Sequence, residues 1–245
     1  MTKAEIQFVR SLADKRTRDT EHLFVAEGFK LVDEIRSSSL RIRNIYTTRD
    51  DVAGRDVVRI EKREMERISQ LNTASDILAV VEQPRYSLKL NDLRSKLTLA
   101  LDGVQNPGNM GTIVRLADWF GIENIICSRE CADLYNPKVV QATMGALLRV
   151  KVHYVDNLSA LLSEAREGGL PIYGTLLDGN NIYNERLSSE GIIVMGNEGR
   201  GLSDECRKAL TDKLFIPPYP ADAPTSESLN VAMATGIILS EFRRK

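Results

Sequence analysis

The sequence GIIVMGNEGRGLSDE, residues 191–205, places three glycines within six residues, directly after an apolar run. Its order, Gly-x-x-Gly-x-Gly, is not the Gly-x-Gly-x-x-Gly of a dinucleotide-binding loop, and the Lys-Ser/Thr pair of a Walker loop is absent. Glu198 lies inside the loop, where a carboxylate repels phosphate. The loop therefore favours a ligand that carries positive charge or donates hydroxyl hydrogen bonds. The structural alternative is a glycine-rich turn before a helix capped by Ser203.

From residue 97 onward, short apolar runs alternate with segments of helical periodicity. Near-continuous apolar strands separated by helices are typical of a parallel sheet covered on both faces. The last segment, LNVAMATGIILSEF (229–242), is apolar nearly all round, which indicates a helix in a core or at a subunit contact. The runs expected to form strands are LTLALDGV (97–104), NIICS (124–128), PIYGTLL (171–177), GIIVMGN (191–197) and KLFIPPY (213–219).

The first part of the chain predicts a smaller α/β unit. FVAEGFKLVDEIRSSS (24–39) has apolar residues at mostly helical intervals from Phe24 onward, and EKREMERISQL (61–71) is also helix-like. RIRNIYTT (41–48) and DILAVVEQ (76–83) have the composition of strands.

The polar stretch RYSLKLNDLRSK (85–96) is the candidate linker between the two parts. A chain of 245 residues, 42% of them hydrophobic, is long enough for two packed cores. We predict an α/β domain over residues 1–88 and an α/β domain with a parallel sheet over residues 89–245.

Composition excludes several classes of protein. No apolar run approaches the roughly 18 to 20 residues that cross a bilayer. The amino-terminal sequence MTKAEIQFVRSLADKRTRD (1–19) is charged and lacks the apolar core of a secretory signal, so we predict a cytoplasmic protein. A net charge of −1 gives no global attraction to nucleic acid, and any such binding must use local basic patches.

The cysteines and histidines do not indicate a metal site. Cys127, Cys131 and Cys206 form no metal-ligand spacing with His22 and His153, and their odd number argues against a disulfide framework. We expect buried thiols and no bound metal.

A second loop follows the strand that ends near Val104, in LDGVQNPGNMGTIVRLADWFG (101–121). Asn109 occupies the position of an N-cap, and Gly121 is placed to end the helix. Arg115 lies off the apolar stripe of this helix, three residues before Asp118. The structural interpretation of these residues is a cap and a salt bridge on a helix surface.

A third loop, FIPPYPADAPTSESLNVAMATG (215–236), contains four prolines that exclude it from a central strand. Ser228 and Asn230 lie where the last helix begins, and both residue types are natural caps.

In this order and at these distances, the three loops resemble the three motifs of the SpoU/TrmH family, within the SPOUT superfamily of RNA methyltransferases. PKVVQATMGALLRV (137–150) resembles the family's intervening helix, and residues 24–83 resemble its amino-terminal substrate-binding domain. The resemblance covers essentially the whole chain. One departure is PYPADAPTSE (218–227), where family members often carry a glycine or two.

The resemblance implies a carboxy-terminal domain with a parallel sheet and a deep trefoil knot, preceded by a small α/β substrate-binding domain. It implies S-adenosylmethionine as cofactor, and a sulfonium cation is compatible with a loop that holds a carboxylate but no phosphate site. By position, the cofactor-binding residues would be Thr175, Leu176, Gly196, Asn197, Gly201, Ile216, Pro218 and Leu229.

The implied reaction is methylation of a ribose 2′-hydroxyl in structured RNA, ribosomal RNA rather than transfer RNA being favoured. The family assigns proton removal to the arginine that matches Arg115. Because arginine normally stays protonated, a role in orienting phosphate and stabilising a developing alkoxide is easier to justify. Asn109, Glu198, Ser228 and Asn230 match the other catalytic positions, where hydrogen bonds to the ribose, to Arg115 or among the loops are expected.

The implied partners are RNA and a second copy of the chain, since family members are usually dimers. Each basic residue taken alone is more simply a solvated surface charge, but as a group they match a phosphate-contacting surface. Our candidates are Lys15, Arg16, Arg18, Arg36, Arg41, Arg43 and Arg49 in the first domain, and Arg149 and Lys151 in the second.

Two other classes of function remain open at this point. A non-enzymatic RNA-binding protein would need the basic residues but not three polar loops held together. A nicotinamide-dependent oxidoreductase would use a similar scaffold, but its glycine fingerprint is absent.

Overall fold

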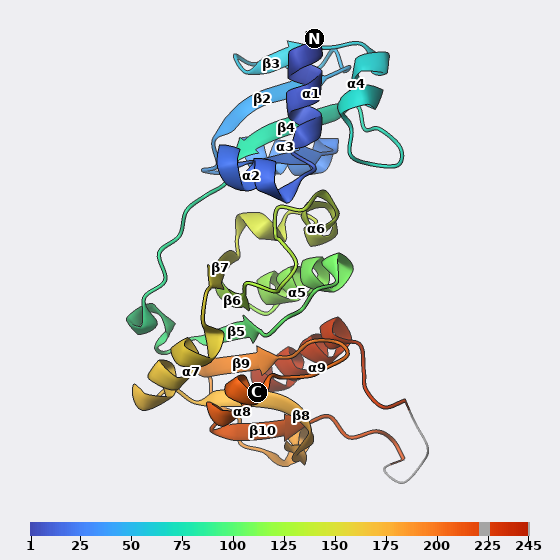
Figure 1. The fold of residues 1–245 in the computed structure, drawn as a ribbon. Helices are drawn as coiled ribbons and strands as arrows, with labels where there is room; N and C mark the ends of the chain where they lie inside the picture. The colour runs from blue at the N-terminus through green and yellow to red at the C-terminus, as the bar shows by residue number, and fades with distance from the viewer. Residues whose placement is uncertain (221–225, 245) are drawn as a thin grey trace. The chain divides into compact units, whose positions relative to one another are not determined.

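The computed structural model describes residues 1–220 and 226–244. The chain divides into two compact units, Met1–Arg85 with Asp133–Leu148, and Tyr86–Ala132 with Arg149–Lys245 (Figure 1). The predicted second domain includes residues 133–148, whereas their packing groups them with the first unit. The reason is local: the Gln141 side chain donates a hydrogen bond to the Glu27 carbonyl at 3.0 Å, and Tyr135 stacks on Phe24 with ring centroids 4.8 Å apart.

The first unit is a four-stranded sheet in the order β1-β4-β2-β3, with β4 antiparallel to both neighbours and β2 parallel to β3. Its apolar core lies between the sheet and the helices α1 and α4. The strands are β1 (Leu23–Glu27), β2 (Ile42–Thr47), β3 (Val57–Arg59) and β4 (Ile77–Glu82), and the α-helices are α1 (Lys3–Ser11), α2 (Lys15–Glu21), α3 (Phe29–Arg36), α4 (Lys62–Ile68) and α6 (Pro137–Thr143).

The helix predicted from Phe24 begins later than its periodicity indicates. Residues 23–27 form strand β1, in which every residue is buried, and α3 begins only at Phe29. Gly28 separates them with a φ of +99°, which a residue with a side chain rarely adopts. The apolar intervals continue across this glycine, so periodicity alone did not reveal the change from strand to helix.

The second unit contains a six-stranded sheet in the order β10-β8-β9-β5-β6-β7, with every pairing parallel, which confirms the predicted class. The strand β7 was missed because His153 is its only buried residue, so this edge strand lacks a continuous apolar run. The strands are β5 (Leu97–Leu101), β6 (Asn124–Ser128), β7 (Lys151–Val155), β8 (Ile172–Asn181), β9 (Gly191–Met195) and β10 (Asp212–Phe215).

Helices pack on both faces of this sheet. Ile192 and Val194 of β9 join a core cluster with residues of α7 and α8, so Ile193 between them points to the opposite face. The α-helices of this unit are α5 (Pro107–Trp119), α7 (Leu158–Glu167), α8 (Asp204–Lys208) and α9 (Val231–Arg243), with α5 packed against α9. The expected polar linker contains the short 3₁₀ helix Leu90–Leu93, whose Leu93 is buried.

Within the described part of the chain, no helix is long and apolar enough to cross a membrane.

Candidate active site

The three predicted loops follow the carboxyl ends of β5, β9 and β10, and β5 and β9 are neighbours in the parallel sheet. β5 and β9 pair in parallel with Leu101 opposite Met195, so the residues that follow each strand leave the sheet side by side. The amide of Asp102 donates to the Met195 carbonyl at 2.9 Å, which continues this pairing into the loops. Ligands of open α/β sheets bind beyond the carboxyl ends of the strands, where these loops lie.

Asn109 links the other two loops through its side-chain amide. Its Nδ2 donates to Glu198 Oε1 at 2.9 Å, and its Oδ1 accepts a hydrogen bond from Asn230 Nδ2 at 3.0 Å. Asn230 in turn caps α9, because its Oδ1 accepts the amides of Ala232 and Met233. Three predicted catalytic residues, one from each loop, therefore form a single hydrogen-bonded chain.

Glu198 is held as a carboxylate in this chain. Partial burial raises its pKa, but the Asn109 side chain and the backbone amides of Glu198 itself, Asn106 and Gln105 outweigh that effect, so its pKa is lowered. The contact from the Asn106 amide is 3.4 Å long. The loop thus carries a fixed negative charge at neutral pH, which agrees with the exclusion of phosphate.

Asn109 was expected to cap α5, and this expectation was wrong. Asn106 is the N-cap, and its Oδ1 accepts the amides of Gly108 at 2.8 Å and Asn109 at 3.1 Å. Pro107 follows at the first helical position, where its missing amide hydrogen costs nothing. Because Asn106 caps the helix, the Asn109 side chain is available to bridge the loops. The predicted cap Ser203 of α8 is confirmed.

The expected partner of Arg115 was also wrong. Asp118 pairs with Arg149, with Asp118 Oδ1 2.9 Å from Arg149 Nε and Oδ2 2.8 Å from Nη2. Arg115 is exposed on α5, and within the described residues its side chain has no hydrogen-bond or ion-pair partner. Ser228 is likewise exposed and makes no hydrogen bond to another described residue. Neither residue joins the chain that Asn109 forms.

The predicted cofactor residues lie where β8 separates from β9, after the ends of β9 and β10, and just before α9. Thr175 Oγ1 donates to the Val194 carbonyl at 3.2 Å, where β8 separates from β9. Leu176 is buried, and Leu229 exposes 51% of its surface. Ile216 and Pro218 are half-buried beyond β10. Of the stretch PYPADAPTSE, residues 221–225 lie outside the described residues.

The loop 196–201 is folded tightly on itself. The backbone amides and carbonyls of Asn197 and Gly201 exchange two hydrogen bonds of 2.9 and 3.0 Å. A Cβ on Gly196 would lie 2.4 Å from the carbonyl carbon of Gly201, so only glycine fits there. The single cationic side chain in the loop, Arg200, approaches Glu130 at 3.7 Å. The loop therefore offers backbone groups and a carboxylate, a set that fits a cationic nucleoside better than a phosphate.

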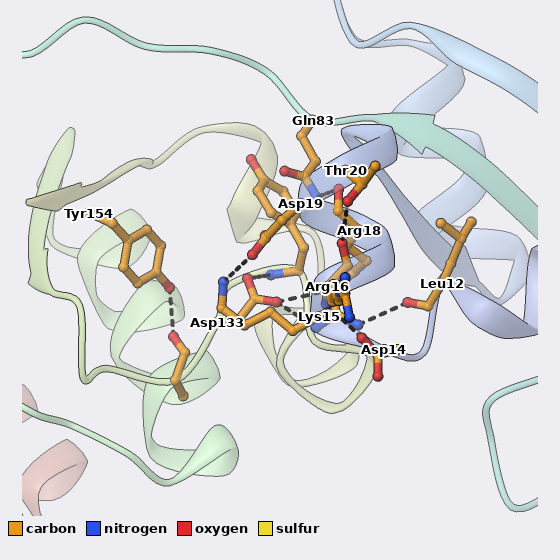
Figure 2. A network of polar contacts seen from close by, with 12 residues as sticks. Leu12, Asp14, Lys15, Arg16, Arg18, Asp19, Thr20, Gln83, Asp133 and Tyr154 are labelled. Atoms are coloured by element: carbon orange, nitrogen blue, oxygen red, sulfur yellow. Dashed lines mark hydrogen bonds and ion pairs between the residues drawn. The ribbon is translucent and has the colours of Figure 1, made fainter.

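Arg18 was expected to contact RNA, and this expectation was wrong. Its side chain is buried, with 1% of the residue exposed. Its guanidinium donates to the Leu12 carbonyl at 2.9 Å and to Asp133 Oδ2 at 2.5 and 3.1 Å (Figure 2). It also donates to the Ala13 carbonyl at 2.7 Å. With these contacts and 1% exposure, Arg18 is a buried structural residue of the first unit.

The remaining basic candidates are at least partly exposed, and their contact with RNA stays a prediction. Some already have partners: Lys15 pairs with Asp19 at 2.7 Å, and Arg49 pairs with Asp51 at 2.6 Å. Other contacts are longer or engage no acidic side chain, namely Arg41 to Glu82 at 3.9 Å, Arg36 to the Ala53 carbonyl, Arg43 over the Phe8 ring and Lys151 over the Tyr86 ring; Arg16 is exposed.

The three cysteines are buried free thiols, as expected. The contact with Cys127 lowers the pKa of Cys131 to about 7, while burial raises the pKa of Cys206 to about 12. No group of three or more histidine, cysteine or acidic residues is placed to hold a metal ion in the described ranges.

Asp102 and Gly103, which follow β5, escaped the sequence interpretation. Asp102 accepts two hydrogen bonds from Ser203, and the Asn197 side chain donates to the Gly103 carbonyl at 2.7 Å. A polar residue directly after a buried strand was the available signal for Asp102, but its partner lies 101 residues away in the sequence.

Comparison with known proteins agrees with the geometry. Residues 96–240 match the model of the SpoU rRNA Methylase family, and residues 3–79 match that of the MRM3-like substrate binding domain. The chain is 29% identical over 241 residues to the 23S rRNA (guanosine(2553)-2'-O)-methyltransferase RlmP of Bacillus subtilis, covering 96% of this chain and 94% of the relative.

Two solved structures resemble almost the whole chain. One is a putative RNA methyltransferase of the TrmH family from Porphyromonas gingivalis, 40% identical with a TM-score of 0.89, covering 99% of this chain and 98% of that one. Another is an AdoMet-bound rRNA methyltransferase from Sinorhizobium meliloti, 28% identical with a TM-score of 0.86, covering 99% and 95%. The family model spans more than half of the chain, and the three loops that define the site lie within it: the chain belongs to the SpoU rRNA methylase family.

Proposed function

We propose that this protein transfers a methyl group from S-adenosylmethionine to a ribose 2′-hydroxyl of ribosomal RNA. The observation that carries the proposal is the hydrogen-bonded chain from Glu198 through Asn109 to Asn230, which joins the three loops at the carboxyl ends of the strands. Family membership, the function named for the Bacillus subtilis relative and the AdoMet-bound Sinorhizobium meliloti structure support it. A cytoplasmic location stays a prediction.

The same loops would hold the cofactor, which supplies an electrophilic methyl group on a sulfonium. Backbone groups of Gly196, Asn197 and Gly201 would bind its polar parts, with Thr175 and Leu176 on the neighbouring strand. Ile216, Pro218 and Leu229 add partly exposed apolar surface beside them. The anionic Glu198 is compatible with the cofactor's positive charge.

Arg115 would act on the substrate. A ribose hydroxyl is a weak nucleophile, so the protein must position it and stabilise negative charge as its proton leaves. Arg115 is exposed and has no ion-pair partner within the described residues, which leaves its guanidinium available to an RNA phosphate and to a developing alkoxide. Glu198, Asn109 and Asn230 would hold the loops and orient the ribose, and we propose a contact to the ribose for Ser228.

RNA would be bound through exposed basic residues of the first unit and through Arg149 in the second. Lys15, Arg16, Arg41 and Arg43 are exposed in the first unit, whereas Arg18 is not available. Such contacts read the phosphate backbone, and the 2′-hydroxyl distinguishes RNA from DNA. Binding should therefore weaken steeply with added salt.

We also propose that the protein is a homodimer. Trp119 on α5 is 84% exposed and Met233 on α9 is 62% exposed, on two helices that pack together in the second unit. Exposed aromatic and methionine side chains are typical of subunit interfaces. The deep trefoil knot is the fold that family membership implies for this domain.

The test is transfer of labelled methyl groups to unmodified ribosomal RNA by Arg115→Ala. We expect transfer to fall at least about a hundredfold, the loss typical of one transition-state donor, while S-adenosylmethionine binding measured by calorimetry changes less than about twofold. Arg129→Ala is the matched control, because Arg129 is an exposed arginine paired with Asp156. Turnover of Arg115→Ala within a few-fold of the parent would refute the role of Arg115.

The same assay, applied to the parent protein, distinguishes methyl transfer from non-enzymatic RNA binding. A parent protein that binds RNA but neither binds S-adenosylmethionine nor transfers label to ribosomal or transfer RNA would be a non-enzymatic RNA-binding protein. Label on transfer RNA alone would support methyl transfer but would show that the substrate is transfer RNA and not ribosomal RNA.

A further inference from the structure

The carboxylate of Asp102 holds the far end of the glycine-rich loop. Asp102 directly follows β5, and its Oδ2 accepts hydrogen bonds from both the backbone amide and the hydroxyl of Ser203, each at 2.7 Å. Ser203 lies two residues beyond Gly201, the last residue of the loop, and is the N-cap of α8. Hydrogen bonds to a charged acceptor are about twice as strong as those between neutral groups. One side chain from the loop that follows β5 therefore fixes the exit of the glycine-rich loop.

The entrance of the glycine-rich loop is attached to Gly103, the residue after Asp102. Asn197 Nδ2 donates to the Gly103 carbonyl at 2.7 Å. Asn197 Oδ1 accepts the amides of Gly199 at 2.9 Å and Arg200 at 3.0 Å, which closes the loop internally. The loop is thus a closed unit that is anchored at both ends to two consecutive residues, Asp102 and Gly103.

These two attachments determine where Glu198 lies. Glu198 is at the tip of the closed loop, and its Oε1 is the acceptor for Asn109. A loop that is rigid internally moves as a body when one anchor is lost, so release of Ser203 displaces the Glu198 carboxylate. The 2.9 Å bond to Asn109 tolerates a displacement of only a few tenths of an ångström before it weakens.

We propose that Asp102 is a positioning residue for methyl transfer: by holding Ser203 it places Gly196–Gly201 for the cofactor and Glu198 for Asn109. The inference rests on the proposed function, because it assigns Asp102 an effect on the site that this function uses. Asp102 itself contacts neither substrate nor cofactor in this account.

The competing explanation is that Asp102 only stabilises the second unit. Asp102→Ala removes the acceptor of both Ser203 bonds, whereas Asp102→Asn keeps an oxygen that can accept them and loses the charge. Ser203→Ala removes the hydroxyl bond and retains the amide bond. The matched control is Asp204→Ala, because Asp204 is an exposed acid next to Ser203.

The first measurement is amide hydrogen exchange of the protein without cofactor, resolved by mass spectrometry. For Asp102→Ala we expect exchange of residues 197–203 to rise at least about tenfold, as expected for loss of a hydrogen bond to a charged group. Exchange in β5 and β9 should change less than twofold. Asp102→Asn and Ser203→Ala should give smaller increases in the same segment, and Asp204→Ala none.

The second measurement is the Kd for S-adenosylmethionine and the kinetics of methyl transfer. We expect Asp102→Ala to raise this Kd about tenfold and to lower kcat as well, with substantial recovery of both in Asp102→Asn. The KM for RNA should stay within twofold, since Asp102 does not contact RNA.

Several outcomes would overturn the proposal. One is Asp102→Ala with loop exchange and Kd within twofold of the parent; another is faster exchange throughout the second unit, which marks a purely structural role. If Asp102→Ala does not fold, Asp102→Asn and Ser203→Ala decide by the same criterion of local exchange. The exchange data need neither cofactor nor RNA, so a parent protein without methyltransferase activity refutes the proposed function separately from the anchoring of the loop.

Discussion

The buried pair of Arg18 and Asp133 gives the sharpest prediction for stability. The Arg18 side chain is only 2% exposed. Within the described residues, Asp133 supplies the only carboxylate that contacts its guanidinium (Figure 2). Asp133→Ala removes two of its four hydrogen bonds and leaves an uncompensated buried charge. Breaking such a pair from one side costs about 3–5 kcal/mol. Because the carbonyls of Leu12 and Ala13 still solvate the cation, we expect the lower end, about 3 kcal/mol.

Two variants calibrate this value. Asp133→Asn keeps an acceptor for Arg18, so we expect a loss of about 1–2 kcal/mol. Asp118→Ala breaks the pair with Arg149, whose side chains are 52% and 27% exposed, and this change should cost less than about 1 kcal/mol. Urea unfolding followed by far-UV circular dichroism gives the free energies. A cost for Asp133→Ala equal to that for Asp118→Ala would refute the argument that burial makes this pair essential.

Two further predictions concern the second unit. Gly196→Ala places a Cβ 2.4 Å from the Gly201 carbonyl carbon, so we expect about 1–3 kcal/mol of strain and at least tenfold weaker S-adenosylmethionine binding by calorimetry. In the control Gly199→Ala, the nearest neighbour of the new Cβ would be 3.7 Å away, and this variant should bind the cofactor within twofold of the parent. Equal affinities of the two variants would contradict the close approach at Gly196. Burial, with a smaller contribution from Lys151, lowers the pKa of His153, so the folded state favours the neutral imidazole. The stability that this provides is present above the unfolded pKa of about 6.5 and is lost as the pH falls toward the folded pKa. The parent should therefore lose stability relative to His153→Gln between pH 7 and pH 5, and a constant difference in unfolding free energy over this range would exclude the linkage.

The inner strands β5, β6, β8 and β9 could be predicted from the sequence because each contains a short apolar run. In a parallel sheet covered on both faces, burial acts on every residue of a strand, and the sequence reports it directly. β7 lies at the sheet edge and is only partly buried, so its residues carry no such signal. β1 is fully buried, but its apolar pattern continues into α3, and only Gly28 marks the boundary.

Residues of the site could be predicted individually, but their partners could not. Asn109, Glu198 and Asn230 were identified through their motifs, whereas their mutual hydrogen bonds join residues 89 and 121 positions apart. Arg18 has the same local sequence environment as its exposed neighbours Lys15 and Arg16. Arg18 differs from these neighbours because it pairs with Asp133, which lies in a segment that we predicted to belong to the second domain. Such a tertiary partner leaves no signal in the local sequence.

The proposed function is tested most directly by methyl transfer from labelled S-adenosylmethionine to separate pools of unmodified ribosomal and transfer RNA, followed by alkaline hydrolysis. A 2′-O-methyl group blocks cleavage of the adjacent linkage, so we expect label in one alkali-resistant dinucleotide from ribosomal RNA. Label in alkali-sensitive mononucleotides would show base methylation and contradict the assignment of the ribose hydroxyl. An absence of label together with an absence of cofactor binding would contradict the enzymatic function itself.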